Sequence, residues 1–396
     1  MTRESFQPSP KSHQNLSFSV FGRIYFKTTI FLLHNVFELE YYNPLMADKI
    51  RIGIIGTGFG AKVHAPAMIY HDNFEVVAIA GRNPEKTEKI AKDLEIPHFY
   101  TDWRTMLKDE TFDAVSVSTP PYLHFTMAKA VLENNFHLLL EKPTTETALE
   151  AKKLVRLAEE NSLVGMMCHE FRYLPHFHFS HDLINQGKIG TIREIYMQTF
   201  FGSFSNVSRL QGHWLLDSKY EGGMLGAIGS HMIDRIRFLT GKEFKEVAGR
   251  VTRKIQIPGF SSDDGFSAVL KMEDEIIVNM AVSATVSPPP PSTLIIGGSE
   301  GTLLISNRDV MFAGSEDQTY DKLDIPTSYS MDMNLAEKDQ RIPPFLKLLD
   351  RFANAIETGE MKTPSLHDGW LNQVTLDGIK SSQKTNNFIK LDSSLF

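Results

Sequence analysis

The fold of this chain is decided by one stretch, Ile50-Arg51-Ile52-Gly53-Ile54-Ile55-Gly56-Thr57-Gly58-Phe59-Gly60-Ala61. Its apolar run is typical of a buried parallel strand, and it leads directly into Gly56-x-Gly58-x-x-Ala61. Gly56 permits a tight turn, Gly58 lets the backbone approach a phosphate, and Ala61 lets the next helix pack closely. Free N–H groups and the positive helix end would then face an anion. The pattern predicts a turn that binds a dinucleotide pyrophosphate through Gly56, Thr57, Gly58, Phe59, Gly60 and Ala61.

Composition places the chain among ordinary two-domain globular proteins. It has 396 residues, of which 42% are hydrophobic and 22% charged. The net charge is −7 and no long basic run occurs, which argues against a nucleic-acid partner. The single cysteine, Cys168, excludes an internal disulfide framework and indicates a reducing, cytoplasmic compartment. We expect Cys168 to be a small buried hydrophobe rather than a nucleophile.

Three regions follow from the changes of pattern along the chain. We expect residues 1–45 to be a poorly ordered extension before Met46, with a targeting peptide as the alternative. The apolar piece Ile30–Leu33 is too short to span a membrane, so no membrane partner is expected. Residues 46–168 alternate strands with helical stretches, which predicts a doubly wound parallel sheet in an α/β fold. Residues 169–396 are rich in β-strand patterns, which predicts an α+β domain for substrate binding and oligomerisation, with an open, largely antiparallel sheet.

The expected elements can be placed by their patterns. In the first region, strands are expected at 50–55, 76–80, 114–118, 137–140 and 164–167, with helices at 66–70, 84–94, 101–108, 124–133 and 147–161. In the second, strands are expected at 192–201, 247–257, 266–272, 276–286, 292–296 and 301–305, with helices at 177–186, 343–357 and 367–384. Residues 313–341 are expected to form a surface excursion.

The end of the second strand bears on the choice of cofactor. An acidic residue that would hold an adenosine 2′-hydroxyl is missing from Ala80-Gly81-Arg82-Asn83. Arg82 could instead pair with a 2′-phosphate, which favours NADP over NAD. The alternative is a solvated arginine in a turn, which would leave the preference open. Arg82 and Asn83 are therefore predicted cofactor contacts.

Polar groups also follow the fourth and fifth strands, whose ends line the ligand crevice of such sheets. The fourth ends in Ser118-Thr119-Pro120-Pro121-Tyr122-Leu123-His124, and the fifth in Leu140-Glu141-Lys142-Pro143. Taken alone, Lys142 would more often be a surface lysine than a catalytic one.

At this point the chain resembles the family of glucose-fructose oxidoreductase, inositol 2-dehydrogenase and the MocA proteins. The resemblance covers residue 48 to the end. It is carried by the glycine turn, Thr119-Pro120 with His124, Glu141-Lys142-Pro143, Gly222-Gly223…Gly229-Ser230-His231…Asp234 and Ser365-Leu366-His367-Asp368-Gly369. It implies a Rossmann domain, a C-terminal α/β domain whose sheet often forms a dimer face, a nicotinamide cofactor, and sugars or cyclitols as substrates. The Lys-Pro bond is often cis in this family.

The resemblance also assigns roles. It implies cofactor contacts from Thr119, Pro120, His124, Glu141 and Lys142. Lys142 would stabilise a developing alkoxide, and His231 would take or return the hydroxyl proton. Asp234 would lie on the same helix face as His231 and contact substrate. Without the family likeness, His231 would be interpreted as a capping or packing histidine.

One departure concerns position 227. Many relatives have an aspartate four residues before the histidine, where this chain has Ala227. Tyr173, Asp217 and Tyr220 are candidates to replace it. Otherwise the chemistry is altered or slow, or the protein is a ligand sensor.

Further candidates lie at the junction between the two domains, in His169-Glu170-Phe171-Arg172-Tyr173-Leu174-Pro175. Arg172 and Tyr173 are predicted substrate contacts, with a structural ion pair as the alternative for Arg172. Trp214 could stack on a sugar or fill core. A metal site is not expected from His176, His178 and His181, because their alternation does not bring three ligands onto one helix face.

The sequence therefore predicts a cytoplasmic NAD(P)-dependent oxidoreductase. It would transfer a hydride between the cofactor and a secondary alcohol or ketone of a sugar or polyol, as a homodimer or homotetramer. The alternatives are a cofactor-binding sensor without catalysis and an NAD-dependent glycoside hydrolase.

Overall fold

A computed structural model describes residues 48–202, 204 and 213–392. The expected extension at 1–45 lies outside these residues. Met46–Phe396 forms one compact unit that contains both sheets. None of the helices among the described residues is long and apolar enough to cross a membrane.

The first sheet has six strands in the order β3-β2-β1-β4-β5-β6, and every neighbouring pair is parallel. This is the order of a dinucleotide-binding sheet, with its switch point between β1 and β4. The strands are β1 (Ile50–Ile55), β2 (Phe74–Ala80), β3 (His98–Tyr100), β4 (Ala114–Val117), β5 (His137–Leu140) and β6 (Gly165–Met167).

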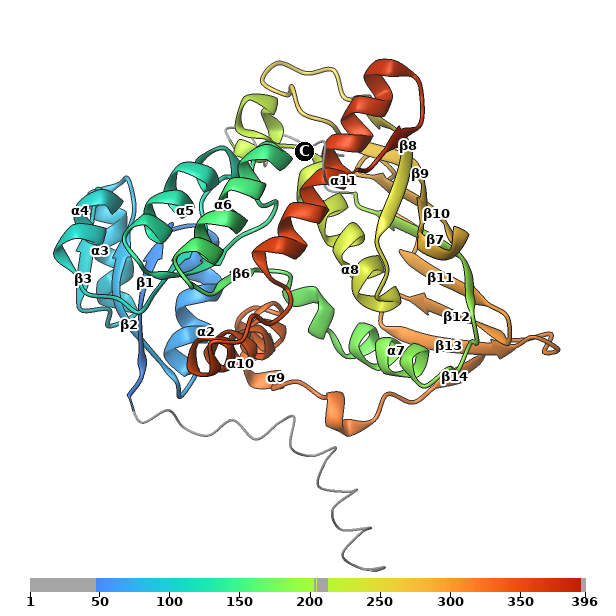
Figure 1. Ribbon diagram of the computed structural model, residues 1–396, viewed down its shortest axis with the longest axis horizontal. Helices are drawn as coiled ribbons and strands as arrows, with labels where there is room; N and C mark the ends of the chain where they lie inside the picture. The colour runs from blue at the N-terminus through green and yellow to red at the C-terminus, as the bar shows by residue number, and fades with distance from the viewer. Residues whose placement is uncertain (1–47, 203, 205–212, 393–396) are drawn as a thin grey trace, which may run out of the picture. The chain divides into compact units, whose positions relative to one another are not determined.

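Helices cover this sheet as the alternating pattern predicts (Figure 1). They are α2 (Ala65–Tyr70), α3 (Pro84–Asp93), α4 (Trp103–Asp109), α5 (His124–Glu133) and α6 (Ala148–Glu160). Asn83, Asp102 and Thr147 cap three of them by accepting a backbone N–H. The first helix begins earlier than expected, with a π-helical turn at Gly60–His64.

The second sheet has nine strands in the order β14-β13-β12-β11-β7-β10-β9-β8-β15. Its pairs are antiparallel except that of β7 with β10. The strands are β7 (Ile192–Phe200), β8 (Phe244–Thr252), β9 (Gly265–Met272), β10 (Ile277–Ser283), β11 (Thr293–Gly298), β12 (Gly301–Ser306), β13 (Asp309–Gly314), β14 (Asp321–Leu323) and β15 (Ile389–Lys390). The fold class is thus the expected one, an α/β chain with a parallel first sheet and a mostly antiparallel second.

Side chains alternate between buried and exposed along β9 and β10, as in a sheet with one covered face. The covering helices are α7 (Pro175–Asn185), α8 (Ser230–Thr240) and α11 (Leu366–Thr385), whose apolar residues join one core with the sheet. The expected excursion at 313–341 contains β14 and α9 (Met333–Lys338).

The helix α10 (Ile342–Thr358) returns to the first sheet. Its Phe345, Leu348 and Phe352 share a core with Ile50 and Phe74. The core of the first sheet is therefore built by residues from both expected regions, 46–168 and 169–396.

Candidate functional site

The glycine turn follows β1 and lies at the carboxyl edge of the first sheet. Gly56 has φ +131°, and a Cβ there would overlap the backbone oxygen of Ser118, so the turn requires glycine. A Cβ on Gly58 would meet nothing within 4 Å, so its exposed backbone can be approached by a ligand.

The close approach between helix and sheet occurs at Gly60. A Cβ there would overlap the Ser118 side chain and come within 3.0 Å of Ile54. Ala61, predicted to allow this packing, is half-buried and packs against the core that contains Ile52 and Ile54.

Arg82 and Asn83 follow β2 beside this turn, and both are exposed. Asn83 Oδ1 accepts the Lys86 N–H at 2.8 Å, so this oxygen caps α3. Gly81 leaves room for Thr57, because a Cβ on Gly81 would overlap the Thr57 side chain. The two predicted cofactor segments, after β1 and after β2, are therefore neighbours.

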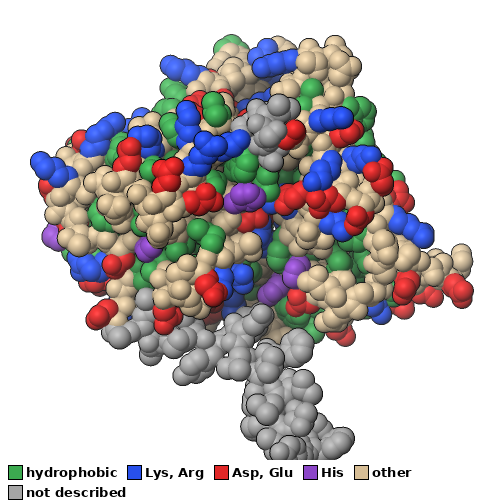
Figure 2. Space-filling view, viewed as in Figure 1, with side chains coloured by type: hydrophobic (Ala, Val, Ile, Leu, Met, Phe, Trp, Pro, Cys, Tyr) green, Lys and Arg blue, Asp and Glu red, His purple; other side chains and the backbone are tan. Residues whose placement is uncertain are grey.

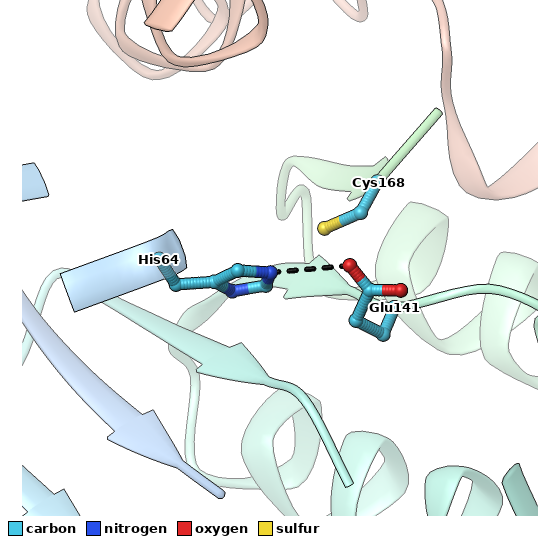
Figure 3. Close-up of side chains that lie close together, drawn as sticks. All are labelled: His64, Glu141 and Cys168. Atoms are coloured by element: carbon cyan, nitrogen blue, oxygen red, sulfur yellow. Dashed lines mark hydrogen bonds and ion pairs between the residues drawn. The ribbon is translucent and has the colours of Figure 1, made fainter. Parts of the chain in front are cut away.

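Below the turn, three buried side chains from different elements meet, as Figure 3 shows. They are His64 from the first helix, Glu141 after β5 and Cys168 after β6. His64 lies 3.1 Å from Glu141 Oε1 through Nε2 and 2.7 Å from Ser116 Oγ through Nδ1. Both contacts are satisfied if Nε2 carries the proton and Ser116 donates to Nδ1.

Glu141 also accepts the backbone N–H of Lys142 at 3.2 Å and a hydrogen bond from the Cys168 thiol. Burial opposes its ionisation, but the hydrogen bond from His64 and nearby positive charges outweigh it and lower the pKa of Glu141. Burial raises the pKa of Cys168 well above its ordinary value, so it remains a thiol. Hydrogen bonds are sufficient to explain why these three side chains lie together. Through its bond to the Lys142 N–H, Glu141 also stabilises the turn that carries Lys142.

The turn after β5 leaves Lys142 half-buried at the carboxyl edge of the first sheet, and its bond to Pro143 is cis. Lys142 Nζ donates to the carbonyl oxygen of Ala227 at 3.2 Å. The ring nitrogens of His124, which is fully buried, lie 2.8 Å from the carbonyl oxygens of Pro143 and Thr119. His124 therefore ties the turn after β4 to that after β5, and both its nitrogens face backbone oxygens.

His231 is the second residue of α8 (Ser230–Thr240), lies close enough to Lys142 to feel its charge, and is 4% exposed. Its ring stacks on Phe171, with centroids 4.3 Å apart. Burial, with a further contribution from the positive charge of Lys142, lowers the pKa of His231 well below its ordinary value. His231 is thus a neutral imidazole near pH 7.

Among residues 48–202, 204 and 213–392, no carboxylate forms a hydrogen bond with the ring of His231. Asp217 accepts the Lys219 N–H, Tyr220 contacts the Tyr122 ring at 5.0 Å, and Tyr173 lies against His178. None of these three candidates takes the place of an aspartate at Ala227.

Arg172 and Asp234, expected to contact substrate, are bound to each other. Arg172 Nε lies 2.8 Å from Asp234 Oδ2, and its Nη2 lies 2.5 Å from Oδ1. Both side chains are almost fully buried. Arg172 therefore forms a structural ion pair, which was the alternative to a substrate contact. A second carboxylate oxygen, Asp368 Oδ1, lies 3.6 Å from its Nη2.

His169 and Glu170, two and three residues after β6, are buried, and the sequence placed them at the domain junction without predicting a role for either. Neither ring nitrogen of His169 nor Oε2 of Glu170 has a hydrogen-bond partner within the described part of the chain. His169 Nε2 lies 3.8 Å from Asp234 Oδ1, and its ring is 6.0 Å from that of His231. Both residues come after a parallel strand, at the same edge of the sheet as Lys142. That position could have marked them in the sequence as candidate site residues.

The remaining candidates lie elsewhere. Trp214 is half-buried in a short helical turn at Trp214–Leu216. His176 contacts the Phe177 ring and His181 stacks on Phe238, so both are used in packing. On the face drawn in Figure 2, Lys and Arg are interspersed with Asp and Glu, without one dominant charged patch.

Two models of protein families match this chain. A model of the oxidoreductase family with an NAD-binding Rossmann fold matches residues 50–169, and one of the GFO/IDH/MocA C-terminal domain matches residues 177–304. An oxidoreductase of Synechocystis sp. is 26% identical over 361 residues, which cover 87% of this chain and 96% of that protein.

Two relatives carry specific names. Levoglucosan dehydrogenase of Pseudarthrobacter phenanthrenivorans is 29% identical over 209 residues, 50% of this chain and 53% of that protein. The NADP⁺-dependent scyllo-inositol 2-dehydrogenase of Bacillus subtilis is 28% identical over 196 residues, 49% of this chain and 52% of that protein.

A solved structure of levoglucosan dehydrogenase with NADH and levoglucosan has the same fold. Its TM-score is 0.78 at 22% identity, over 87% of this chain and 100% of that chain. With the two family models covering most of both sheets, the chain belongs to the GFO/IDH/MocA family of NAD-binding oxidoreductases.

Proposed function

We propose that this protein transfers a hydride between NADP(H) or NAD(H) and a secondary alcohol or ketone of a sugar or cyclitol. One observation carries the proposal. The glycine turn and Lys142 follow β1 and β5 at the carboxyl edge of the parallel sheet, and the buried imidazole of His231 from α8 is near enough to Lys142 for that charge to lower its pKa. Such an edge is where open α/β sheets bind ligands.

The residues present fit a dinucleotide. Gly58 offers open backbone, and Gly56 and Gly60 allow the turn to lie against Ser118. The nicotinamide ring would supply the hydride chemistry, so this chain need only orient a carbon and move one proton.

We assign that proton to His231 and the charge to Lys142. In the oxidation direction, the substrate hydroxyl would give its proton to the neutral imidazole as the hydride leaves. The ammonium of Lys142 would stabilise negative charge that develops on the same oxygen. The Ala227 carbonyl and the Glu141 network hold Lys142 in place for this role.

Further observations support the choice of cofactor and substrate. Arg82 is exposed beside the glycine turn and supports a preference for NADP. The named relatives act on levoglucosan and scyllo-inositol, which supports a cyclic polyol. The single buried cysteine supports a reducing, cytoplasmic location, and we expect a homodimer or homotetramer.

A second candidate is a sensor that binds the cofactor without turnover. This candidate is favoured by Ala227, which replaces the usual aspartate. It is also favoured by the surroundings of His231, whose ring contacts within the described residues are with Phe171 and His169. A histidine without an orienting carboxylate is a weaker proton acceptor.

The test is a panel of cyclic polyols and sugars, each incubated with NAD⁺ and with NADP⁺ while absorbance of the reduced cofactor is followed. The proposal expects turnover with at least one member, lost in His231→Phe. Binding of reduced cofactor with no turnover across the panel would favour the sensor. Release of sugar without net absorbance change would indicate a hydrolase.

A further inference from the structure

Glu170 is a buried carboxyl group that the proposed chemistry does not use. It lies three residues after β6, at the start of the short helical turn Glu170–Tyr173, is 2% exposed, and its Oε2 has no hydrogen-bond partner among the described residues. An unpaired polar atom inside a protein is costly, so its presence calls for an explanation, of which a role toward a ligand or a reaction is one.

Titratable groups from three elements surround Glu170, and all of them except the neutral Cys168 thiol are charged. They are Glu141 and Lys142 after β5, Cys168 after β6, and Arg341 at the start of α10. Burial, reinforced by the negative charge of Glu141, raises the pKa of Glu170 to about 8, while Lys142 and Arg341 oppose the shift. Glu141 is ionised because it accepts hydrogen bonds from three donors. The site therefore holds one ionised and one protonated carboxyl group near neutral pH.

The strand order places Glu170 on the β5–β6 side of the switch point between β1 and β4. In a sheet of this strand order, the two nucleotides of a dinucleotide lie on either side of the switch point. The glycine turn and Arg82 follow β1 and β2, on the adenosine side. Lys142 and Glu170 follow β5 and β6, on the nicotinamide side.

We propose that Glu170 faces the bound nicotinamide and that its protonation state is coupled to the redox state of the cofactor. This inference rests on the proposed function. The oxidised ring carries a positive charge and the reduced ring carries none. An ionised Glu170 would therefore stabilise the oxidised cofactor, whereas a protonated Glu170 would favour the reduced one.

The proton balance follows directly. When the oxidised cofactor binds near neutral pH, Glu170 releases one proton to solvent. When the reduced cofactor binds, Glu170 keeps its proton. Glu170 exchanges no electrons and forms no covalent bond in either case.

The experiment measures dissociation constants of NADP⁺ and NADPH, and of NAD⁺ and NADH, from about pH 6 to about pH 9. The informative quantity is the ratio of the constants for the oxidised and reduced forms of one nucleotide. Titration of the 2′-phosphate cancels in this ratio, because both forms carry it. The proteins are the wild type, Glu170→Gln and, as a matched control, Glu160→Gln at the exposed end of α6.

We expect the wild-type ratio to fall by at least about tenfold across this range, because the oxidised form gains a carboxylate neighbour. The ratio should be independent of pH in Glu170→Gln and unchanged from wild type in Glu160→Gln. If Glu170→Gln does not fold, the wild-type slope and its retention in Glu170→Asp decide the matter.

The outcomes distinguish failure of this inference from failure of the proposed function. If both forms bind the wild type with a ratio that does not change with pH, the inference is overturned while the proposed function stands. A full slope in Glu170→Gln would also overturn it. If no pyridine nucleotide binds the folded protein, the proposed function fails and the inference fails with it.

Discussion

Replacing Lys142 with methionine removes one positive charge from the proposed reacting centre and keeps most of the side-chain volume. Lys142 is held by a hydrogen bond of 3.2 Å to the Ala227 carbonyl and follows the buried Glu141. Methionine cannot make that bond, but it can occupy the same half-buried position. We therefore expect the fold and the glycine turn to be preserved.

The size of the effect follows from Coulomb's law. Two unit charges about 4 Å apart attract by about 4 kcal/mol at an effective dielectric constant of about 20. Lys142 is half-buried, and solvent screening reduces this figure to about 2–3 kcal/mol in the transition state. Because about 1.4 kcal/mol corresponds to a tenfold change in rate, Lys142→Met should lower kcat about 100-fold.

The assay is cofactor reduction with the most active polyol of the panel, alongside a titration of reduced cofactor and a thermal unfolding curve. Lys129→Met is the matched control, because Lys129 is exposed on α5 and pairs with Glu133. Turnover within about threefold of wild type would refute the role of Lys142 at the reacting oxygen. Loss of cofactor binding would assign Lys142 to the cofactor site instead.

Three other changes test separate parts of the structure. Arg82→Ala should weaken NADPH binding about tenfold more than NADH binding if the guanidinium binds the 2′-phosphate, and equal weakening of both would contradict that role. Arg172→Leu should lower the free energy of unfolding by about 3–5 kcal/mol in denaturant, because buried Asp234 loses its bidentate partner; a change below about 1 kcal/mol would be inconsistent with this pair. The pKa of Asp368 is lowered from 3.8 to about 2, because Arg172 and Arg237 outweigh the effect of burial. This group therefore stabilises the fold above its ordinary pKa, and the stabilisation is lost as pH falls toward 2. Asp368→Asn should cost about 2 kcal/mol at pH 7 and flatten the acid dependence of unfolding between about pH 4 and about pH 2, and an unchanged acid transition would contradict this.

The features that the sequence predicted well are local in the chain. The glycine turn and most strands of the first sheet depend on a few adjacent residues, so their pattern is visible without a structure. The strand β3 was missed because it has three residues and its side chains at His98 and Phe99 are exposed, which leaves no hydrophobic periodicity.

The site itself depends on contacts between residues far apart in the chain. Arg172 and Asp234 are separated by 62 positions, and His64 and Glu141 by 77. Sequence patterns give no distance between such residues, so neither the partner of Arg172 in its ion pair nor the His64 network could be predicted. The burial of Glu170 likewise depends on α10, which returns to the first sheet from the far end of the chain.

Equilibrium titration with NADPH and NADH, followed by fluorescence, tests most directly whether the turn after β1 binds a dinucleotide. The titration should be run on the wild type and on Gly58→Val. We expect saturable one-site binding to the wild type, and binding at least about tenfold weaker in Gly58→Val, whose fold should persist because a Cβ there meets no protein atom. No binding to folded wild type, or equal affinity in both proteins, would contradict the account.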